Sequence, residues 1–447
     1  MFNILNLKED SRSSYDNAGR FFSRPGDGWG TVKRSSAAKV AESVEFRSLK
    51  SFDPGGRLLS YDTMKTRSRR LSFLVGERSF VELLLANPGS SSLKLTWTKD
   101  RERIREKDVE LAAPGEGLDR ALRDALSMER DLSFAAVGVR VVHGGDLFHG
   151  PCRVGKDTIP RIRSLSHLAP IHQEPSVHLL ESFLRLYPKL PLVASFDTVF
   201  HATLEPEAYR YAIPGEWSRR GIRKFGFHGL SFNYLAHRVP ELLGREGTGR
   251  LVALHLGNGS SACAIEDGRS VDTTMGLTPL DGLVMGTRPG RVDPGVLLAL
   301  MEEGVSEKDL FQGLWLKSGL SALSAEGPDF RRIWAAFEDG DDRATLAVNL
   351  TARRAAQSVG EMAVAMGGID ILAFTGGIGE HAWGFRQRIA DRLAFMGVAL
   401  DIDRNRSGTG DREIGTEGAS VRSVVVAARE DWTLDRDVRS VLMGETP

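Results

Sequence analysis

Cysteine is scarce in this chain, which carries only Cys152 and Cys263 among its 447 residues. Two thiols support neither a disulfide framework nor a cysteine-based zinc site, and such low usage is typical of a reducing cytosol. Long apolar runs are missing too, because no stretch approaches the length that crosses a bilayer. Charged residues interrupt the N-terminus from Lys8 onward, which is unlike a signal peptide. We therefore expect a cytoplasmic protein that does not enter a membrane.

The chain also lacks an excess of charge of either sign. Lys and Arg together number 59, Asp and Glu together number 59, and the formal net charge is zero. Proteins that bind nucleic acid normally carry a basic excess or a basic patch, so we expect no nucleic-acid partner. Any site for an anion must therefore be built locally.

Residues 1–75 are rich in Ser, Arg, Gly and Asp and have few periodic apolar positions. This composition predicts a disordered or loosely packed N-terminal extension. Two alternatives stay open. The basic cluster between Lys65 and Arg70 could bind nucleic acid or an anionic surface, or Met64 could be the natural start of the protein.

From Val81 onward, apolar β-branched runs alternate with stretches of helical periodicity. The runs predicted to be strands are Val81–Leu85, Leu93–Trp97, Ala135–Val142, Pro191–Phe196, Leu251–Leu256, Ile369–Phe374 and Val421–Ala427. The stretches predicted to be helices are Leu118–Met128, Pro175–Tyr187, Pro294–Glu303, Phe330–Phe337, Asp342–Met366, Trp383–Met396 and Thr433–Met443. The alternation predicts an α/β protein with mixed or parallel sheets. We expect an N-terminal domain over 76–200, joined by the C-terminal helix 432–447, and a C-terminal domain over 201–431.

Two turns rich in Gly and Ser each lie between apolar strands. The first is Asn-Pro-Gly-Ser-Ser-Ser-Leu-Lys at residues 87–94, and the second is Gly-Asn-Gly-Ser-Ser at residues 257–261. Backbone N–H groups and hydroxyls converge in such turns without bulky side chains, which suits a phosphate, and Lys94 adds a cation. Two such loops suggest two halves that close around one nucleotide.

Five further segments place a charged or titratable residue in a loop or at the end of a strand. Their key residues are Arg140, His172, Asp197, His228 and Arg288. Ligands of α/β sheets usually bind beyond the carboxyl ends of strands, and a guanidinium in a Gly/Pro turn can face an oxyanion. Each residue taken alone also has a structural interpretation, such as a turn cap or a surface arginine. A Gly-rich turn at residues 375–379 permits close approach of a ligand, but its spacing does not match the dinucleotide fingerprint.

Taken together, these segments resemble the acetate kinase family of actin-like (ribonuclease H-like) ATPase-fold phosphotransferases. The motifs that carry the resemblance are NPGSSSLK, VRVVHGG, LAPIH, FDTVFH, KFGFHG, HLGNGSS, TPLDGLVMGTRPG, FTGGIGE and RED, in this order from about Leu83 to about Val438. The resemblance implies two actin-like domains with a nucleotide cleft between them. It also implies reversible transfer of the γ-phosphoryl group of ATP to acetate, with Mg²⁺ or Mn²⁺ as cofactor, in an enzyme that is typically a homodimer.

The resemblance also implies roles for individual residues. The residues of catalysis would be Arg140, Arg288, His228, His172 and Asp197. Asn87, Asp197 and Glu430 would hold the metal. Arg140, Val142, Ile171, Phe227 and Pro279 would bind the carboxylate substrate and its methyl group. The nucleotide would contact Ser90, Ser92, Lys94, His255, Leu256, Gly257, Asn258, Gly259, Asp329, Phe330, Arg331, Gly376, Gly377, Ile378 and Gly379.

The chemistry of these residue types agrees with phosphoryl transfer to a carboxylate. A carboxylate is already ionised near neutral pH, so the nucleophile needs no general base. Cations that neutralise and position phosphate oxygens are then the main requirement. The chain departs from the family pattern at several motif positions: His381 follows the GIGE turn, and the stretch between Lys94 and Arg140 is short. A propionate or other short-chain acyl kinase and a non-catalytic nucleotide-binding regulator remain as alternatives.

Overall fold

The computed structural model describes residues 81–89, 92–110, 117–129 and 134–445. The predicted extension 1–75 and the nucleotide-binding prediction for Ser90 lie outside these residues. Within the described ranges, no helix combines the length and the apolar character that a membrane span requires.

The first sheet has six strands in the order β3-β2-β1-β4-β6-β5. Their bounds are β1 Glu82–Pro88, β2 Ser92–Lys99, β3 Glu102–Glu110, β4 Ala136–Val141, β5 Cys152–Arg153 and β6 Leu192–Phe196. Strands β1, β2 and β3 form an antiparallel meander, while β4 and β6 continue the sheet parallel to β1. The short β5 closes the other edge antiparallel to β6.

The second sheet also has six strands, in the order β11-β12-β10-β7-β8-β9. Their bounds are β7 Arg250–Leu256, β8 Ser260–Glu266, β9 Arg269–Thr273, β10 Ile371–Thr375, β11 Arg412–Glu413 and β12 Arg422–Val425. Here β7, β8 and β9 form the meander, β10 and β12 run parallel to β7, and β11 is the antiparallel edge. The two sheets therefore share one strand order and one set of directions, which is the signature of a duplicated unit. The α/β class expected from the sequence is confirmed.

Each Gly/Ser turn occupies the same place in its sheet. Strand β1 ends at Pro88 and β2 begins at Ser92, and β7 ends at Leu256 and β8 begins at Ser260. In both sheets the turn lies at the carboxyl end of the strand that also pairs in parallel with β4 or β10. The duplication therefore provides two comparable turns, one from each sheet.

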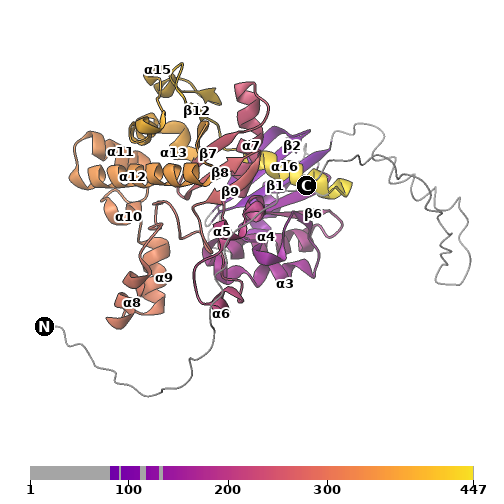
Figure 1. Cartoon of the computed structure of the whole chain (residues 1–447). Coiled ribbons are helices and arrows are strands. Elements are labelled where there is room, and N and C mark those ends of the chain that lie inside the picture. The colour runs from indigo at the N-terminus through magenta and orange to yellow at the C-terminus, as the bar shows by residue number, and fades with distance from the viewer. Residues whose placement is uncertain (1–80, 90–91, 111–116, 130–133, 446–447) are drawn as a thin grey trace, which may run out of the picture. The chain divides into compact units, whose positions relative to one another are not determined.

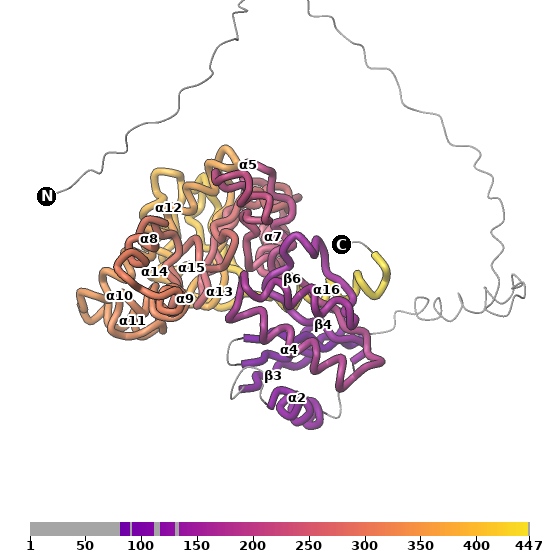
Figure 2. Tube along the Cα trace, turned by 90° about the horizontal axis from the view of Figure 1, so that it is seen from below, coloured from indigo at the N-terminus to yellow at the C-terminus, as the bar shows by residue number. Residues whose placement is uncertain are grey.

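Helices cover both faces of both sheets. Two of these helices, α7 (Gly229–Leu243) and α16 (Glu430–Met443), do not pack on the sheet that precedes them in sequence but on the other sheet. Helix α7 follows the first sheet in sequence but packs on the second through Phe232, Leu235 and Val239. Helix α16 follows the second sheet but packs on β1, β4 and β6 of the first. Figure 2 shows the yellow α16 beside the purple β4 and β6.

A glycine in β4 allows α16 to approach the first sheet closely. A Cβ on Gly138 of β4 would lie only 2.5 Å from Val438 Cγ2, so the helix packs directly on the backbone. Successive residues of β1 alternate between the two faces: Leu83 and Leu85 pack with α16, whereas Leu84 and Ala86 pack against the opposite core. This period of two is what a strand buried on both faces requires.

The opposite face of the first sheet is covered by α2 (Leu118–Ser127), α3 (Thr158–Arg163) and α4 (Pro170–Leu186). The opposite face of the second sheet packs against α11 (Phe330–Glu338), α12 (Asp342–Ala365) and α14 (Trp383–Asp391). Short helices α5 (Pro206–Tyr209), α6 (Gly215–Ser218), α10 (Leu320–Leu323), α13 (Gly376–His381) and α15 (Ile402–Arg406) fill the connections. The described residues also include the 3-10 turns η1 Gly145–Leu147, η2 Ser166–Leu168, η3 Val199–Thr203 and η4 Ala394–Met396.

Helices α8 (Pro294–Glu302) and α9 (Glu307–Leu316) form a hairpin that extends away from the second sheet, as Figure 1 shows. Helix α8 is strongly apolar, yet none of its residues is buried. Only Trp315 of α9 is buried.

Candidate active site

The first Gly/Ser turn is held by its own backbone. Gly89 N–H donates to the carbonyl of Ser92 at 2.7 Å, which closes the turn between β1 and β2. Asn87 lies at the end of β1, opposite Lys94 in the strand register. The Lys94 ammonium is exposed and pairs with Glu106 at 3.2 Å. The side-chain amide of Asn87, the hydroxyl of Ser92 and the ammonium of Lys94 therefore lie near this turn, where β1 ends and β2 begins.

The second Gly/Ser turn is bonded to the loop that carries Arg288. Gly257 N–H donates to Gly259 O at 3.1 Å, and Gly286 N–H donates to Asn258 O at 3.0 Å. A Cβ on Gly286 would lie 2.0 Å from Asn258 Oδ1, so a larger residue would displace the Asn258 amide. The two loops are therefore one packed unit, and Arg288 is placed relative to the turn.

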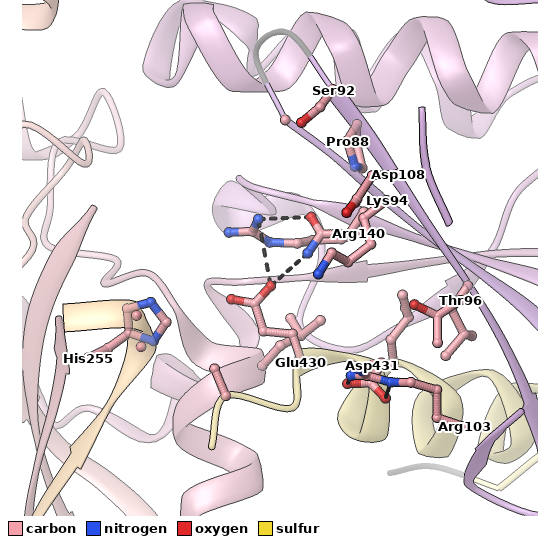
Figure 3. A pocket seen from close by; sticks show the side chains of 18 residues that line it. Pro88, Ser92, Lys94, Thr96, Arg103, Asp108, Arg140, His255, Glu430 and Asp431 are labelled. Carbon is pink, nitrogen blue, oxygen red and sulfur yellow. Dashed lines mark hydrogen bonds and ion pairs between the residues drawn. The ribbon is translucent and has the colours of Figure 1, made fainter. Parts of the chain in front are cut away.

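Arg140 is the centre of a polar network between the sheets. Its Nε and Nη2 bind the two carboxylate oxygens of Asp197 at 2.9 and 2.5 Å, and its Nη1 donates to Asn87 Oδ1 at 3.0 Å. Nη1 also lies 3.8 Å from Glu430 Oε2, which accepts from Asn87 Nδ2 at 2.8 Å. Figure 3 shows Glu430 between Arg140 and His255.

The two carboxylates beside Arg140 differ in their electrostatics. Burial raises the pKa of Asp197 even though Arg140 opposes that change. Burial also acts to raise the pKa of Glu430, but Arg140, His255 and Asn87 outweigh it and lower the pKa overall. Burial disfavours the charge of Arg140, yet Asp197 and Glu430 raise its pKa, so the guanidinium stays charged.

His228 and His255 form a stacked pair of imidazoles, with ring centroids 4.2 Å apart. His228 Nδ1 lies 2.9 Å from Ser261 Oγ, and His255 Nδ1 lies 2.9 Å from Ser231 Oγ. His228 is one of four non-glycine residues with positive φ among those described, at φ 57°. A left-handed backbone at such a residue costs roughly 1–2 kcal/mol, so the surrounding structure must hold it.

Arg288 lies next to His228 across the second turn. A Cβ on Gly259 would lie 2.8 Å from Arg288 Nη2 and 3.2 Å from His228 Nε2. Arg288 is buried, and its Nη1 donates to Pro279 O at 2.7 Å. No carboxylate pairs with it among the described residues, and burial lowers its pKa to about 10. A buried guanidinium without a counter-ion favours an anionic ligand.

His172 approaches the same region from the first turn of α4. Burial, Arg288 and Arg140 together lower its pKa to about 3, so the ring is neutral. Its Nδ1 is buried and has no hydrogen-bond partner within the described part of the chain. The ring lies 6.2 Å from that of Trp315 on α9.

A small apolar cluster adjoins these polar groups. Val142 and Phe227 are buried together with Ala169, Met275 and Met285. Ile171 is half-buried beside His172, and Pro279 is buried and bonded to Arg288 through its carbonyl. His143 connects the cluster to the loop before Pro279, because its Nε2 lies 3.1 Å from Leu277 O.

Two cavities adjoin the network. The first has a volume of about 370 Å³ and includes Asn87, Ser92, Lys94, Arg140, His255, Gly376, Gly377 and Glu430 in its lining. The second has a volume of about 810 Å³ and is lined by Gly257, Asn258, Pro328, Asp329, Phe330, Arg331, Trp334, Gly377, Ile378, His381 and Ala382. Gly377 lines both, so a polar cavity meets a largely apolar and aromatic one at this residue.

The structure therefore gathers Arg140, Arg288, His228, His172 and Asp197 into one region between the two sheets. Asp329 and Arg331 instead pair with each other at 2.7 Å on the rim of the larger cavity. Leu256 is buried within β7, while Gly379 is buried in α13.

Sequence reasoning did not select several residues that shape the site. Ser231 and Ser261 orient the two stacked histidines, and Trp334 and His381 line the larger cavity. Ser261 belongs to a Gly/Ser motif that the sequence reveals. The sequence does not reveal that its hydroxyl pairs with His228, which lies 33 residues away. Trp334 has only helical periodicity as a signal, which is equally typical of a core residue.

Comparisons with known proteins identify relatives over most of the chain. Residues 76–436 match the model of the acetokinase family. An acetate kinase of Rhodopseudomonas palustris (strain ATCC BAA-98 / CGA009) is 43% identical over 306 residues, which cover 68% of this chain and 76% of the relative. An acetate kinase of Thermoanaerobacterium thermosaccharolyticum is 37% identical over 396 residues, covering 81% of this chain and 99% of the relative.

Solved structures agree with these relatives. The crystal structure of Porphyromonas gingivalis acetate kinase superposes with a TM-score of 0.74 at 32% identity, covering 81% of this chain and 100% of that one. A propionate kinase from Francisella tularensis superposes with a TM-score of 0.73 at 30% identity, covering 80% and 98% of the two chains.

Proposed function

The chain belongs to the acetokinase family, and on this basis we propose that it transfers the γ-phosphoryl group of ATP reversibly to acetate. The products are acetyl phosphate and ADP. The observation that carries the proposal is the convergence of three groups: in addition to burial, Arg140 and Arg288 both lower the pKa of His228, and Arg288 meets His228 at the second Gly/Ser turn. The fold expected from the resemblance, that of the actin-like ATPases, is confirmed by the match to the solved acetate kinase.

In this proposal the cations act on charge and position. Arg140 and Arg288 bind the acetate carboxylate and the phosphoryl group in transfer, and His228 donates a hydrogen bond to the phosphoryl oxygens. Arg288 suits this role because it is buried with no carboxylate partner in the described structure. Acetate is ionised at neutral pH, so the reaction needs electrostatic stabilisation rather than a base. His172 is neutral and offers an additional donor or acceptor.

The two cavities suit the two parts of a nucleotide. The polar cavity would hold the phosphates against Asn87, Ser92, Lys94 and His255. The larger cavity would hold the adenosine against Phe330, Gly377 and Ile378, and the turn residues Gly257 and Asn258 also line it. Their meeting point at Gly377 leaves room for a ligand to pass, because a Cβ there would touch nothing within 4 Å.

Asp197, Glu430 and Asn87 have the donor chemistry for a magnesium or manganese ion. All three contribute oxygen atoms, which Mg²⁺ prefers, and each lies within 4 Å of the Arg140 guanidinium. No group of three or more His, Cys, Asp or Glu in the described residues could hold a metal unaided. We propose that they hold the ion jointly with the nucleotide phosphates. When bound, the ion would supply charge neutralisation at the phosphate oxygens.

A second candidate is a propionate or other short-chain acyl kinase. The similar propionate kinase structure favours it, and the apolar cluster around Val142 and Phe227 would bind the acyl methyl group in both cases. One methylene in an apolar pocket is worth only roughly 1–3 kcal/mol, so the two activities differ in degree. Acetate remains the substrate that we propose.

We further propose that the two sheets are two domains, 76–200 with helix 432–447 and 201–431, which close over the nucleotide. Closure would exclude water, which otherwise competes with acetate for the phosphoryl group. The enzyme would act in the cytoplasm, where ATP is available.

A homodimer is also part of this proposal. The exposed apolar side chains of α8 and α9 are Val296, Leu298, Met301, Phe311 and Leu316. A helix that is apolar all round is normally buried, so α8 suits contact with a second copy of the chain.

The reaction can be tested with purified full-length protein, Mg²⁺ and ATP, using hydroxylamine to trap the acyl phosphate. Acetate, propionate and butyrate should be compared, and we expect the highest kcat/KM for acetate. A form that starts at Met64 should be assayed in parallel. Nucleotide binding without any acyl hydroxamate would instead favour a regulatory protein.

A further inference from the structure

His201 is a buried imidazole that takes no part in the proposed phosphoryl transfer. It stands in η3, four residues after Asp197, and only 1% of its surface is exposed. Its Nδ1 lies 2.8 Å from Ser270 Oγ on β9, and its Nε2 lies 2.9 Å from the carbonyl oxygen of Phe227. Both ring nitrogens are therefore satisfied by groups from other parts of the chain.

These partners define which nitrogen of His201 carries the proton. The Phe227 carbonyl can only accept, so Nε2 is the donor. Burial lowers the pKa of His201 to about 4, so the ring is neutral and Nδ1 is the acceptor. Ser270 then donates its hydroxyl proton to Nδ1. The hydroxyl orients the ring, and the ring holds the carbonyl.

The backbone before His228 lies directly against this ring. Gly226 has φ 76°, and a Cβ there would lie 2.6 Å from Cδ2 of His201 and 2.5 Å from Cγ2 of Thr273. Only glycine permits this contact. His201 therefore supports the turn at residues 226–229 through packing as well as through a hydrogen bond.

Three consecutive residues of that turn bind the segment from Asp197 to His201. Phe227 accepts from His201, the backbone N–H of His228 donates to the Asp197 carboxylate, and Gly229 N–H donates to Asp197 O at 2.9 Å. Between them His228 takes its left-handed backbone conformation. We propose that His201 is a positioning residue, which fixes the Phe227–His228 peptide and thereby aims the His228 ring at the transferring phosphoryl group.

This inference rests on the proposed function for its kinetic consequence, but its structural consequence is independent of the substrate. Without the bond to Phe227, the peptide before His228 can rotate out of the left-handed conformation. The His228 ring would then leave Ser261 and the stack with His255. The larger cavity, which would hold the adenosine, is lined by residues from 257 onward and contains no part of the turn.

Two substitutions separate the bond to Phe227 from the bond to Ser270. In His201→Gln the amide NH₂ extends about as far as Nε2 and can still donate to Phe227, whereas in His201→Asn it reaches only as far as Nδ1. We expect His201→Asn to lower kcat by about 10- to 100-fold with the KM for ATP unchanged, because small displacements of catalytic groups have effects of this size. His201→Gln should keep kcat within about threefold of the wild type.

Ser270→Ala and Cys263→Ala provide a matched pair if His201→Asn does not fold. Both remove a small buried group beside the ring, but Ser270 Oγ lies 2.8 Å from Nδ1 and Cys263 Sγ lies 4.0 Å from it. Ser270→Ala should lower kcat by about 3- to 10-fold, since it removes only the orienting bond. Cys263→Ala should lower the melting temperature without changing kcat.

Hydrogen exchange tests the positioning without reference to activity. Backbone amides at 226–229 should exchange faster in His201→Asn than in the wild type, and His201→Gln should restore the slow exchange. Equal exchange and equal kcat in wild type and His201→Asn would overturn the proposal, as would equal impairment of the Asn and Gln variants. A wild type that makes no acetyl phosphate but shows the expected exchange pattern would count against the proposed function alone.

Discussion

The imidazole of His228 lies stacked on that of His255, with ring centroids 4.2 Å apart and ring planes inclined by 21°. Burial lowers the pKa of His228 well below 6.5, and His255, Arg140 and Arg288 add to the effect. Burial also lowers the pKa of His255, against the opposing influence of Glu430. Both rings are therefore neutral in the free protein at neutral pH, each with one N–H to donate.

The first prediction concerns pH. Because His228, His255 and His172 all have lowered pKa values, none should titrate near 6.5 in the free enzyme. We expect kcat/KM for magnesium-bound ATP, which reports the free enzyme, to show no inflection near pH 6.5 from these three imidazoles. An inflection near pH 6.5 that disappears in His228→Asn would contradict this expectation.

The second prediction concerns Arg288. Its replacement by Ala or Lys should lower kcat by about 10²- to 10³-fold, because it removes a preorganised cation from a buried site. Lys should not substitute, since it lacks the fork that reaches both Pro279 and an anion. Arg291→Ala is the matched control: this exposed residue pairs with Glu361 at 2.6 Å and should retain wild-type turnover. A fully active Arg288→Ala enzyme would refute the role of Arg288.

The third prediction tests the junction of the two cavities. Gly377→Leu should raise the KM for ATP by about tenfold or more, equivalent to about 1.4 kcal/mol, because the new side chain would occupy the passage. Folding should be unaffected, since a Cβ at Gly377 meets nothing within 4 Å. Gly360→Leu is the control, because Gly360 lies within α12 with equally open space and lines neither cavity.

The fourth prediction concerns stability and Asp437 of α16. Burial raises the pKa of this carboxyl to about 6, although the Ser195 hydroxyl donates to it at 2.5 Å. A folded-state pKa above the unfolded value stabilises the fold below about pH 3.8, and this stabilisation disappears as the pH rises through 6. Asp437→Asn should therefore increase the free energy of unfolding at pH 8 by at most about 3 kcal/mol. The gain should shrink towards pH 5.

Urea unfolding at pH 8, 6.5 and 5 would measure this difference. Asp435→Asn is the control on the same helix, because the Asp435 carboxylate is bound by Arg439 at 2.6 Å and by the Thr98 hydroxyl. That substitution leaves Arg439 without its charged partner, so it should destabilise the fold at every pH. The prediction would be wrong if Asp437→Asn lowered the free energy of unfolding equally at pH 8 and pH 5. Burial of the ionised Asp437 carboxylate would then not destabilise the fold.

The fifth prediction concerns the α8–α9 hairpin. Leu298→Glu with Met301→Glu should convert a dimer to a monomer in sedimentation velocity, because both side chains are more than half exposed on an apolar helix. Val364→Glu on α12 is the control, since Val364 is 82% exposed and lies outside the hairpin. If the control dissociates the dimer and the hairpin variant does not, contact between copies occurs elsewhere.

The sequence predicts the α/β class and the seven apolar strands, because a strand buried on both faces must be apolar. It does not reveal β3, whose sequence ERIREKDVE is almost entirely charged. An edge strand can be recruited by backbone pairing alone, and β3 pairs with β2 over its whole length. Its charged side chains protect the edge, as is common in natural sheets. Helix α7 is likewise not among the predicted helices, and Pro240 stands inside it.

The Gly-rich segment at 376–381 shows how packing can outweigh local propensity. Three glycines in six residues favour a turn, yet the segment is the helix α13. The buried guanidinium of Arg386 donates to the carbonyls of Gly379 and Glu380, both at 2.8 Å, and so satisfies the end of this helix. The order of the motifs likewise predicts candidate site residues. It does not predict that Ser261 and Ser231 pair with His228 and His255, because these pairs form only in the folded chain.

Because α16 lies at the end of the chain but covers the first sheet, it affects folding during synthesis. The first sheet is complete in sequence at Phe196, but α16, which covers one of its faces, is synthesised more than two hundred residues later. At ribosomal speeds of about 5–20 residues per second, Leu83, Leu85 and Val193 wait for roughly ten to fifty seconds before Leu434 and Val438 reach them. During that interval the nascent chain presents an uncovered apolar surface, so chaperone capture should be most frequent just before translation ends.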